Sequence, residues 1–387
     1  MIYLDNAATS WPKPPSVYAT LGSFLQVAGA NPGRSGHRMA TLAAATVDDT
    51  RRKLARLFSM SDPRRVIFAA NATDALNLAI KGILSSGDHA LTTVMEHNSV
   101  RRPLRALEVL GISTTKVGAD AEGFIDPMEV REALRPNTRL VAITHASNVN
   151  GAIQPIAEIA EIVRRHGAFL LIDAAQTTGV LPLPLEQLGI DLLAFPGHKA
   201  LMGPPGTGGL ALGPRVDVDD LEPVREGGTG GNSEEDVQPR ELPARYEAGT
   251  LNTVGIAALG TALDFVLEMG VSAIGSHERE MTTRLIEGLR AIPGTRVLAP
   301  VDPQRRAAAV SFTVQGWEPA DLGAALDGAF EVACRTGLHC APEACGALGA
   351  LPYGTVRFSP GFFTTAAEID DAVEAVRELA KASLQAV

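Results

Sequence analysis

The segment Phe169-Leu-Leu-Ile-Asp173-Ala-Ala-Gln176 is an apolar run that ends in a carboxylate and a carboxamide. A short apolar run bounded by polar residues is typical of a strand buried in a parallel sheet. Lys199 follows a second run of this kind, in Phe195-Pro-Gly-His-Lys199. Because open α/β sheets bind ligands beyond the carboxyl ends of their strands, we expect Asp173 and Lys199 to meet at one edge of the sheet.

Apolar runs of similar length recur along the first two thirds of the chain. Amphipathic stretches such as Pro155–His166 separate them, and this alternation predicts a mostly parallel sheet covered by helices. The expected strands are Val66–Ala69, Ala90–Val94, Leu140–Thr144, Phe169–Ile172 and Leu192–Phe195.

Longer helical stretches dominate after about residue 255. The expected elements there are two helices, 256–269 and 276–291, and two strands, 308–314 and 355–358. Thr365 and Glu368 form the pattern of a capping box ahead of a final amphipathic helix. We therefore expect an α/β fold with a large domain of residues 15–254 and a smaller α+β domain of residues 1–14 and 255–387.

The composition gives the chain a net negative charge. Its 44 Asp and Glu against 34 Lys and Arg make a formal charge of -10, and no run rich in Lys and Arg offers a surface for a phosphate backbone. The N-terminus lacks the pattern of a secretory signal, and no apolar run is long enough to span a bilayer. Three cysteines agree with a reducing compartment. We therefore expect a cytoplasmic protein with neither nucleic-acid nor membrane partners.

Residues Asn71-Ala72-Thr73-Asp74 lie where a strand is expected to turn into a helix. Backbone amides at a helix N-terminus favour an anion, so Ala72 and Thr73 are candidates for binding a phosphate group. The same residues could instead form an ordinary helix cap that binds only its own backbone. The segment Gly203–Leu210 has the glycine spacing of a P-loop without its lysine and hydroxyl residues, and we interpret it as a turn.

Six short motifs occur in order over nearly the whole chain: YLDNAAT at 3–9, MEHNS at 95–99, DAAQ at 173–176, GHK at 197–199, EAGT at 247–250 and RTGLHCA at 335–341. Together they resemble the cysteine desulfurase and selenocysteine lyase branch of the class V aminotransferase-like enzymes. This resemblance implies a pyridoxal phosphate (PLP)-dependent transferase of fold type I. It also implies a homodimer whose active sites are shared across the interface.

The resemblance assigns roles to the pair of charges at the sheet edge and to one histidine. Lys199 would bind PLP covalently, which suits an amine that loses its proton in an apolar or cationic setting. Asp173 would keep the pyridine nitrogen protonated, so that the ring accepts electrons from the substrate. His97 would stack on the ring and assist proton transfer, a role that suits a side chain titrating near neutrality.

Other positions carry over from the family in the same way. The ring hydroxyl would receive hydrogen bonds from Gln176 and Asn148. The residues implied for the phosphate are Ala72, Thr73, His198 and, contributed by the partner subunit, Thr250. Arg357 would bind the substrate carboxylate through two parallel hydrogen bonds, with Asn148 also at the substrate. In one departure, relatives usually have Ser or Thr where this chain has Pro196, and Thr207 is a candidate replacement for that hydroxyl.

The three cysteines lie close together in the sequence. Cys340 matches the sulfur-accepting cysteine of the family, and Arg335 and His339 are candidates for favouring its thiolate. Cys334 ends an apolar run and is expected to be a buried small hydrophobe. Cys345 has no assigned role, although an exposed thiol there could accept or relay sulfur. The spacings do not match the usual zinc-binding patterns, so no metal site is expected.

The resemblance therefore implies a cysteine desulfurase. Such an enzyme converts L-cysteine to L-alanine, holds the sulfur on Cys340 as a persulfide and passes it to an acceptor protein or thiol. Three alternatives stay open: a selenocysteine lyase acting on L-selenocysteine, a class V enzyme with another amino-acid substrate and an idle Cys340, and a PLP-binding scaffold without turnover. Leu338 bears on the first of these, because many relatives have a histidine there.

Overall fold

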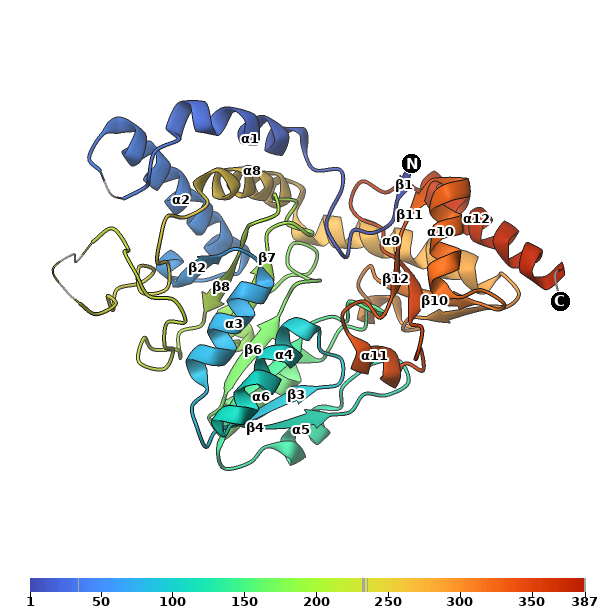
Figure 1. Ribbon diagram of the computed structural model, residues 1–387, viewed down its shortest axis with the longest axis horizontal. Coiled ribbons are helices and arrows are strands. Elements are labelled where there is room, and N and C mark those ends of the chain that lie inside the picture. Colours follow the sequence, from blue (N-terminus) through green and yellow to red (C-terminus); the bar gives the residue numbers. More distant parts are fainter. Residues whose placement is uncertain (34, 232–233, 235, 386–387) are drawn as a thin grey trace.

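The central feature of the computed structural model, which describes residues 1–33, 35–231, 234 and 236–385, is a seven-stranded sheet (Figure 1). Its strand order is β2-β8-β7-β6-β5-β3-β4, and among these strands β8 alone runs in the direction opposite to the others. The strands are β2 (Val66–Ala69), β3 (His89–Thr93), β4 (Ser113–Val117), β5 (Thr138–Thr144), β6 (Phe169–Asp173), β7 (Leu192–Pro196) and β8 (Gly208–Leu212). The predicted α/β class with a mostly parallel sheet is confirmed.

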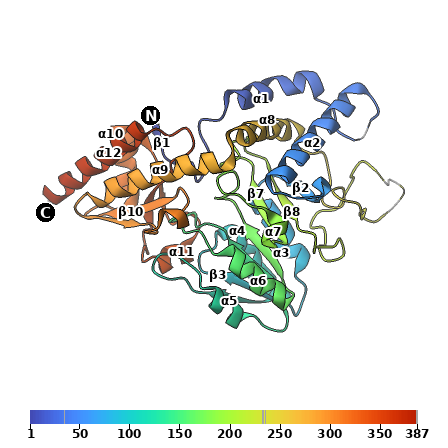
Figure 2. The ribbon, with the colours of Figure 1, turned by 180° about the vertical axis from the view of Figure 1, so that it is seen from behind.

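Helices cover both faces of this sheet. The alternation along β6 explains why, because Leu170 and Ile172 enter one hydrophobic core whereas Phe169 and Leu171 enter the other. The helices α3 (Ala72–Ile83) and α4 (Asn98–Leu107) cover the face seen in Figure 1. The opposite face, seen in Figure 2, is covered by α5 (Pro127–Ala133), α6 (Ile156–His166) and the short α7 (Leu185–Leu188).

Three further helices pack on one another beside this sheet: α1 (Pro15–Ala28), α2 (Arg38–Leu57) and α8 (Thr253–Met269). Ile256, Leu259 and Leu263 of α8 belong to the core of the large domain, so the expected boundary at residue 254 falls in the first turn of a helix that packs with that domain. The chain enters the small domain at Gly270, where α8 and α9 (Val271–Arg290) meet at an angle of 80°. Within the described residues no single helix is long and apolar enough to cross a membrane, and α8 with α9 meets that criterion only as a bent pair.

A four-stranded antiparallel sheet, ordered β12-β13-β10-β9, forms the small domain. Its strands are β9 (Thr295–Leu298), β10 (Val310–Val314), β12 (Arg335–Gly337) and β13 (Thr355–Phe358), and α9 packs on it with α10 (Pro319–Phe330) and α12 (Ala366–Gln385). The expected capping box precedes α12, since the Glu368 carboxylate accepts a hydrogen bond from the Thr365 amide at 2.8 Å. The strand β1 (Ile2–Tyr3) pairs with β11 (Val332–Ala333), and the remaining short elements are α11 (Pro342–Ala347), η1 (Pro63–Arg65), η2 (Glu108–Leu110) and η3 (Pro303–Arg305).

Gly208 lies against the turn where β2 passes into α3. It pairs with Ala69 of β2, and a Cβ atom at this position would lie 2.8 Å from the Asn71 Cα and 2.7 Å from the Phe195 carbonyl oxygen. Both distances are shorter than a van der Waals contact, so glycine is needed for the close approach of β8 to this turn. Gly208 therefore helps to fix the start of α3.

The substitution Gly208→Ala should lower the thermal unfolding midpoint of the protein. The added methyl group must displace the backbone at Asn71, and overpacking of this kind costs about 1–3 kcal/mol. The matched control is Gly22→Ala in α1, where an added Cβ meets no heavy atom within 4 Å and alanine favours the helix. Scanning calorimetry of both variants checks the prediction, and equal midpoints would contradict it.

Candidate active site

A cavity of about 200 Å³ lies beyond the carboxyl ends of β5, β6 and β7. The last residues of these strands, Thr144, Asp173 and Pro196, line it, so it occupies the edge where the sequence predicts a ligand site. Of the predicted site residues, the following line this one cavity: Ala72, Thr73, His97, Asn148, Asp173, Gln176, His198, Lys199 and Arg357. Cys340 and Thr250 are not among the lining residues.

Lys199 follows β7, and its side chain forms part of the cavity wall. Burial lowers the pKa of Lys199 to about 8. The Asp173 carboxylate opposes this pKa shift, whereas the guanidinium groups of Arg357 and Arg335 reinforce it. A neutral amine is the form of lysine that attacks a carbonyl carbon. The site therefore makes Lys199 a better nucleophile near neutral pH than an ordinary surface lysine.

Asp173 ends β6 with its carboxylate buried. It pairs in register with Thr144 of β5 and Ala194 of β7, which places it among the central strand ends. Burial raises the pKa of Asp173, and the hydrogen bond from the Ala175 amide, at 3.0 Å, and the charge of Lys199 act against that rise. A buried carboxylate of this kind suits a charged N–H group on a ligand.

His97 is the N-cap residue of α4. Its Nδ1 accepts a hydrogen bond from the Ser99 amide at 3.1 Å, so the neutral ring carries its proton on Nε2. Burial, together with the positive charges of Lys199 and Arg335, lowers the pKa of His97 to about 4. His97 is thus a neutral ring at pH 7 and not, as the sequence suggested, a group that titrates near neutrality. It is suited to stacking on another ring and to donating a hydrogen bond from Nε2.

The N-terminus of α3 opens onto the same cavity. The Asn71 side chain accepts a hydrogen bond from the Asp74 amide at 2.9 Å, and the Asp74 carboxylate accepts one from the Ala70 amide at 3.0 Å. The helix is therefore capped by its own residues, while Ala72 and Thr73 line the cavity. The two interpretations that the sequence left open, a cap and an anion site, are compatible here.

The hydroxyl that is missing at Pro196 is not replaced by Thr207. The Thr207 hydroxyl donates to a backbone carbonyl of its own turn at 2.7 Å, and Thr207 does not line the cavity. Ser99 lines the cavity instead, with its hydroxyl 2.7 Å from that of Thr73. Nδ1 of His198 is buried without a partner among the described residues, and burial lowers the pKa of His198 to about 4. His198 can therefore contact an anion as a neutral hydrogen-bond donor.

Arg357 reaches the cavity from β13 and is fully buried. One of its terminal nitrogens donates to the Asp5 carboxylate at 2.8 Å, and the other donates to the Asn148 carbonyl oxygen at 2.9 Å. Two-point binding of a substrate carboxylate therefore requires the substrate to share or displace these partners. The Asn148 side chain itself donates to the His339 carbonyl oxygen at 2.6 Å.

Cys340 lies in a tight loop between β12 and α11. His339 and Cys340 have φ values of 50° and 59°, a left-handed backbone that costs non-glycine residues on the order of 1–3 kcal/mol each. The Asn98 amide holds this loop by donating to the Cys340 carbonyl oxygen at 2.8 Å. An Arg335 guanidinium nitrogen donates to the Cys340 sulfur at 3.0 Å, which gives a thiolate at this position a cationic partner.

His339 and Cys345 do not have the roles that the sequence suggested. His339 is buried with Nε2 2.7 Å from the Thr355 hydroxyl, and burial, reinforced by two nearby arginines, lowers the pKa of His339 to about 3. It is neutral at pH 7 and cannot add positive charge beside Cys340. Cys345 is fully buried, and burial raises its pKa to about 11, so it is not an exposed sulfur relay. Cys334 was expected to be buried, but it is only partly buried where it packs against the small-domain core.

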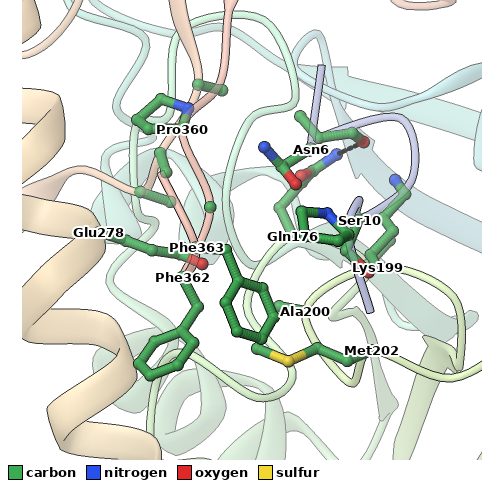
Figure 3. Close-up of a pocket in the computed structure, with 17 residues that line it drawn as sticks. Asn6, Ser10, Gln176, Lys199, Ala200, Met202, Glu278, Pro360, Phe362 and Phe363 are labelled. Atoms are coloured by element: carbon green, nitrogen blue, oxygen red, sulfur yellow. Dashed lines mark hydrogen bonds between the residues drawn. The ribbon is translucent and has the colours of Figure 1, made fainter. Parts of the chain in front are cut away.

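A second, smaller cavity of about 40 Å³ adjoins the first along Gln176 and Lys199. Figure 3 shows Phe362, Phe363 and the Glu278 carboxyl group across this cavity from Lys199. Burial raises the pKa of Glu278 to about 8, so the group is mostly a neutral acid at pH 7. The Gln176 side chain, between the two cavities, donates to a backbone carbonyl oxygen at 3.1 Å.

The chain is similar to known proteins in both sequence and structure. Residues 2–372 match the family model described as Aminotransferase class-V. The chain belongs to the class-V aminotransferase family. Members of this family generally depend on PLP.

The class-V relatives of this chain cover nearly its full length. A probable cysteine desulfurase of Methanothermobacter thermautotrophicus is 33% identical over 98% of this chain and 94% of its own. One of Halalkalibacterium halodurans is 35% identical over 88% of this chain and 84% of its own. The apo structure of the cysteine desulfurase from Thermococcus onnurineus NA1 has a TM-score of 0.91 at 31% identity, covering 98% of this chain and 95% of that one. The expected fold type I is thereby confirmed.

Two residues of this class-V site were given no binding role from the sequence. Asp5 pairs with Arg357, and Ser99 contacts both Thr73 and His97. Asp5 lies in the YLDNAAT motif and Ser99 in the MEHNS motif. Their position in these motifs was the sequence signal that could have identified them. Their partners are mostly distant in the chain, so only the folded structure identifies the contacts.

The pKa of Lys199 predicts how fast a small acylating reagent modifies it in the cofactor-free protein. Below pH 8 the amine is protonated and unreactive, so modification should reach half of its maximal rate near pH 8, not near the ordinary value of 10.5. The substitution Asp173→Asn should move this midpoint to lower pH, and Arg335→Gln should move it to higher pH. Peptide mass spectrometry measures the rate, with exposed Lys81 as the internal reference. A midpoint near 10 for Lys199 would contradict the prediction.

Proposed function

We propose that this chain is a PLP-dependent cysteine desulfurase, which converts L-cysteine to L-alanine and takes up the sulfur on Cys340. The observation that carries the proposal is that three groups meet around one cavity: the Lys199 amine, the Asp173 carboxylate and the Arg335 guanidinium that holds the Cys340 sulfur. The names of the relatives, which are cysteine desulfurases along most of this chain, support the assignment.

The residues around the cavity fit PLP. The N-terminus of α3 and the buried, unpaired side chain of His198 suit a phosphate group. Asp173 suits a protonated ring nitrogen, and His97 is a neutral ring that can stack on another ring. When bound through Lys199, PLP supplies an electron sink for the substrate carbon.

The substrate side of the cavity is positively charged. Arg357 would hold the substrate carboxylate and exchange its bond with Asp5 for one with the substrate. The Lys199 amine, with a pKa of about 8, would take a proton from the substrate α-carbon. His97 is a poorer base, because its Nδ1 already accepts the hydrogen bond from Ser99.

Cys340 performs the sulfur transfer. Its sulfur, which the Arg335 guanidinium contacts, attacks the substrate sulfur as a thiolate. A sulfur–sulfur bond forms while the carbon–sulfur bond breaks, and the electron pair of the broken bond stays with the substrate carbon. That carbon takes up a proton and becomes the methyl group of alanine. Cys340 is left as a persulfide, from which an acceptor protein or a small thiol takes the terminal sulfur.

A second copy of the chain completes the proposed site. Thr250 is exposed, and its hydroxyl accepts a hydrogen bond from the Asn31 side chain at 2.9 Å. It does not line the cavity of its own chain. Because the family resemblance assigns Thr250 to the phosphate of the neighbouring site, we propose a homodimer that brings this segment across the interface.

Alanine formation from L-cysteine by the purified holoenzyme tests the proposal. The substitution Lys199→Ala should reduce turnover by on the order of 10³-fold or more, because it removes the group that attaches the cofactor and moves the proton. Cys340→Ser should abolish both alanine formation and the persulfide seen by mass spectrometry. Cys334→Ser is the matched control, since this thiol packs on the small-domain core, and it should retain activity.

Full desulfuration of L-cysteine by Cys340→Ser would remove Cys340 from the reaction. Assays of the same variants with L-selenocysteine distinguish a cysteine desulfurase from a selenocysteine lyase. If Cys340→Ser kept full activity on L-selenocysteine and lost it on L-cysteine, the chain would be a selenocysteine lyase. PLP binding without alanine from either substrate would make it a scaffold.

A further inference from the structure

Glu96, in the MEHNS motif, is a fully buried carboxyl group that does not line the cavity. Its Oε1 accepts hydrogen bonds from the Thr93 hydroxyl at 2.7 Å and the Thr144 amide at 3.1 Å. Its Oε2 is buried and has no partner among the described residues. A carboxyl group buried in this way is costly, so its presence beside the site needs an explanation.

The two hydrogen bonds of Glu96 join strand ends that the backbone does not hold together. Thr93 ends β3 and Thr144 ends β5. The paired register between these strands runs from His89 only as far as Leu91, opposite Val141. Glu96 therefore bridges β3 and β5 beyond the point where their register pairing stops.

Each of these strand ends carries a group of the site. His97 directly follows Glu96 in the chain, so the position of Glu96 fixes the start of α4. Thr144 pairs in register with Asp173. The next residue, His145, donates its amide to the Asp173 carbonyl oxygen at 2.9 Å. Glu96 is thus linked through the chain to His97, the residue expected over the cofactor ring, and through Thr144 to Asp173, the residue expected at the ring nitrogen.

The surroundings of Glu96 favour its protonated form. Burial raises the pKa of Glu96 to about 8, and the charge of Asp173 acts in the same direction against the bonds from Thr93 and Thr144. Below that pH the group is a neutral acid, which can still accept both hydrogen bonds at Oε1. A neutral group also adds no second negative charge beside Asp173.

We propose that Glu96 is a positioning residue, a neutral bridge between the ends of β3 and β5 that sets His97 relative to Asp173. This inference rests on the proposed function, because His97 and Asp173 are the groups that would contact the ring of PLP. Glutamine would preserve the bridge, since it keeps the acceptor oxygen and the neutral charge. Alanine would break it and leave two buried donors without a partner.

Four variants distinguish a positioning role of Glu96 from a role of its negative charge and from a general loss of protein stability. Glu96→Gln keeps the bridge, Glu96→Ala removes it, and Thr93→Val removes one of its two bonds. The matched control is Thr92→Val. Thr92 is buried on the same strand and donates to the Ala142 carbonyl oxygen of β5 at 2.8 Å, so this variant removes a β3–β5 hydrogen bond that does not involve Glu96.

Each variant is measured in four ways: kcat and KM with L-cysteine, PLP affinity of the cofactor-free protein, the pH midpoint of the visible absorption band of bound PLP, and thermal unfolding. The band responds to the titratable and charged groups that line the cavity, which are Asp173, His97, His198, Lys199, Arg335 and Arg357. Glu96→Ala should lower kcat by on the order of tenfold to a hundredfold, because displaced reacting groups have effects of this size. It should also weaken PLP binding and shift the midpoint, with a smaller change in Thr93→Val. Glu96→Gln and Thr92→Val should stay close to wild type.

Equal damage in Glu96→Gln and Glu96→Ala would show that the charge matters, and would overturn the neutral bridge. A Glu96→Ala variant that matches Thr92→Val in kcat, PLP affinity and absorption midpoint would overturn it as well. If the wild type forms no alanine from L-cysteine, the proposed function fails. PLP affinity and the absorption midpoint then still decide the role of Glu96.

Discussion

The site depends on two opposite charges that are buried together at the ends of adjacent parallel strands. Asp173 ends β6, and Lys199 follows β7, whose Ala194 pairs with Asp173 in register. Burial favours the neutral form of both groups, since it lowers the pKa of the amine and raises that of the carboxyl group. The charge of each limits the shift of the other. The sheet therefore sets an amine that is ready to react near neutral pH beside a carboxyl group that can hold a cationic ring.

The small domain adds a second electrostatic feature to this edge. Arg335 on β12 and Arg357 on β13 lie directly opposite each other in the register of the small sheet. Like charges in that arrangement repel, and each guanidinium has one anionic or nucleophilic partner: the Cys340 sulfur for Arg335 and the Asp5 carboxylate for Arg357. Because two adjacent cations are stabilised by nearby anions, this pair favours the binding of a substrate carboxylate and the presence of a thiolate. One pair of strands thus serves both substrate binding and the sulfur-accepting residue.

Local sequence was sufficient for the fold and for many of the residues that line the cavity, but not for the state of its groups. Strands β6 and β7 match expectation to within one residue, because runs buried on both faces leave a clear apolar pattern. The edge strand β4, which is largely polar and exposed, left no such pattern and was not predicted. Motif order correctly grouped Asp173 with Lys199. The neutral states of His97 and His339 and the burial of Cys345 depend on contacts between distant segments, which no local pattern reports.

The central claim is that the buried amine of Lys199 binds the cofactor. It is tested most directly by the visible absorption spectrum of the purified protein with pyridoxal phosphate, followed by borohydride reduction and peptide mass mapping. The account predicts a visible band that disappears on reduction and a mass increase confined to the peptide that carries Lys199. A protein that stays colourless, or a mass increase on exposed lysines such as Lys81 without one on Lys199, would contradict it.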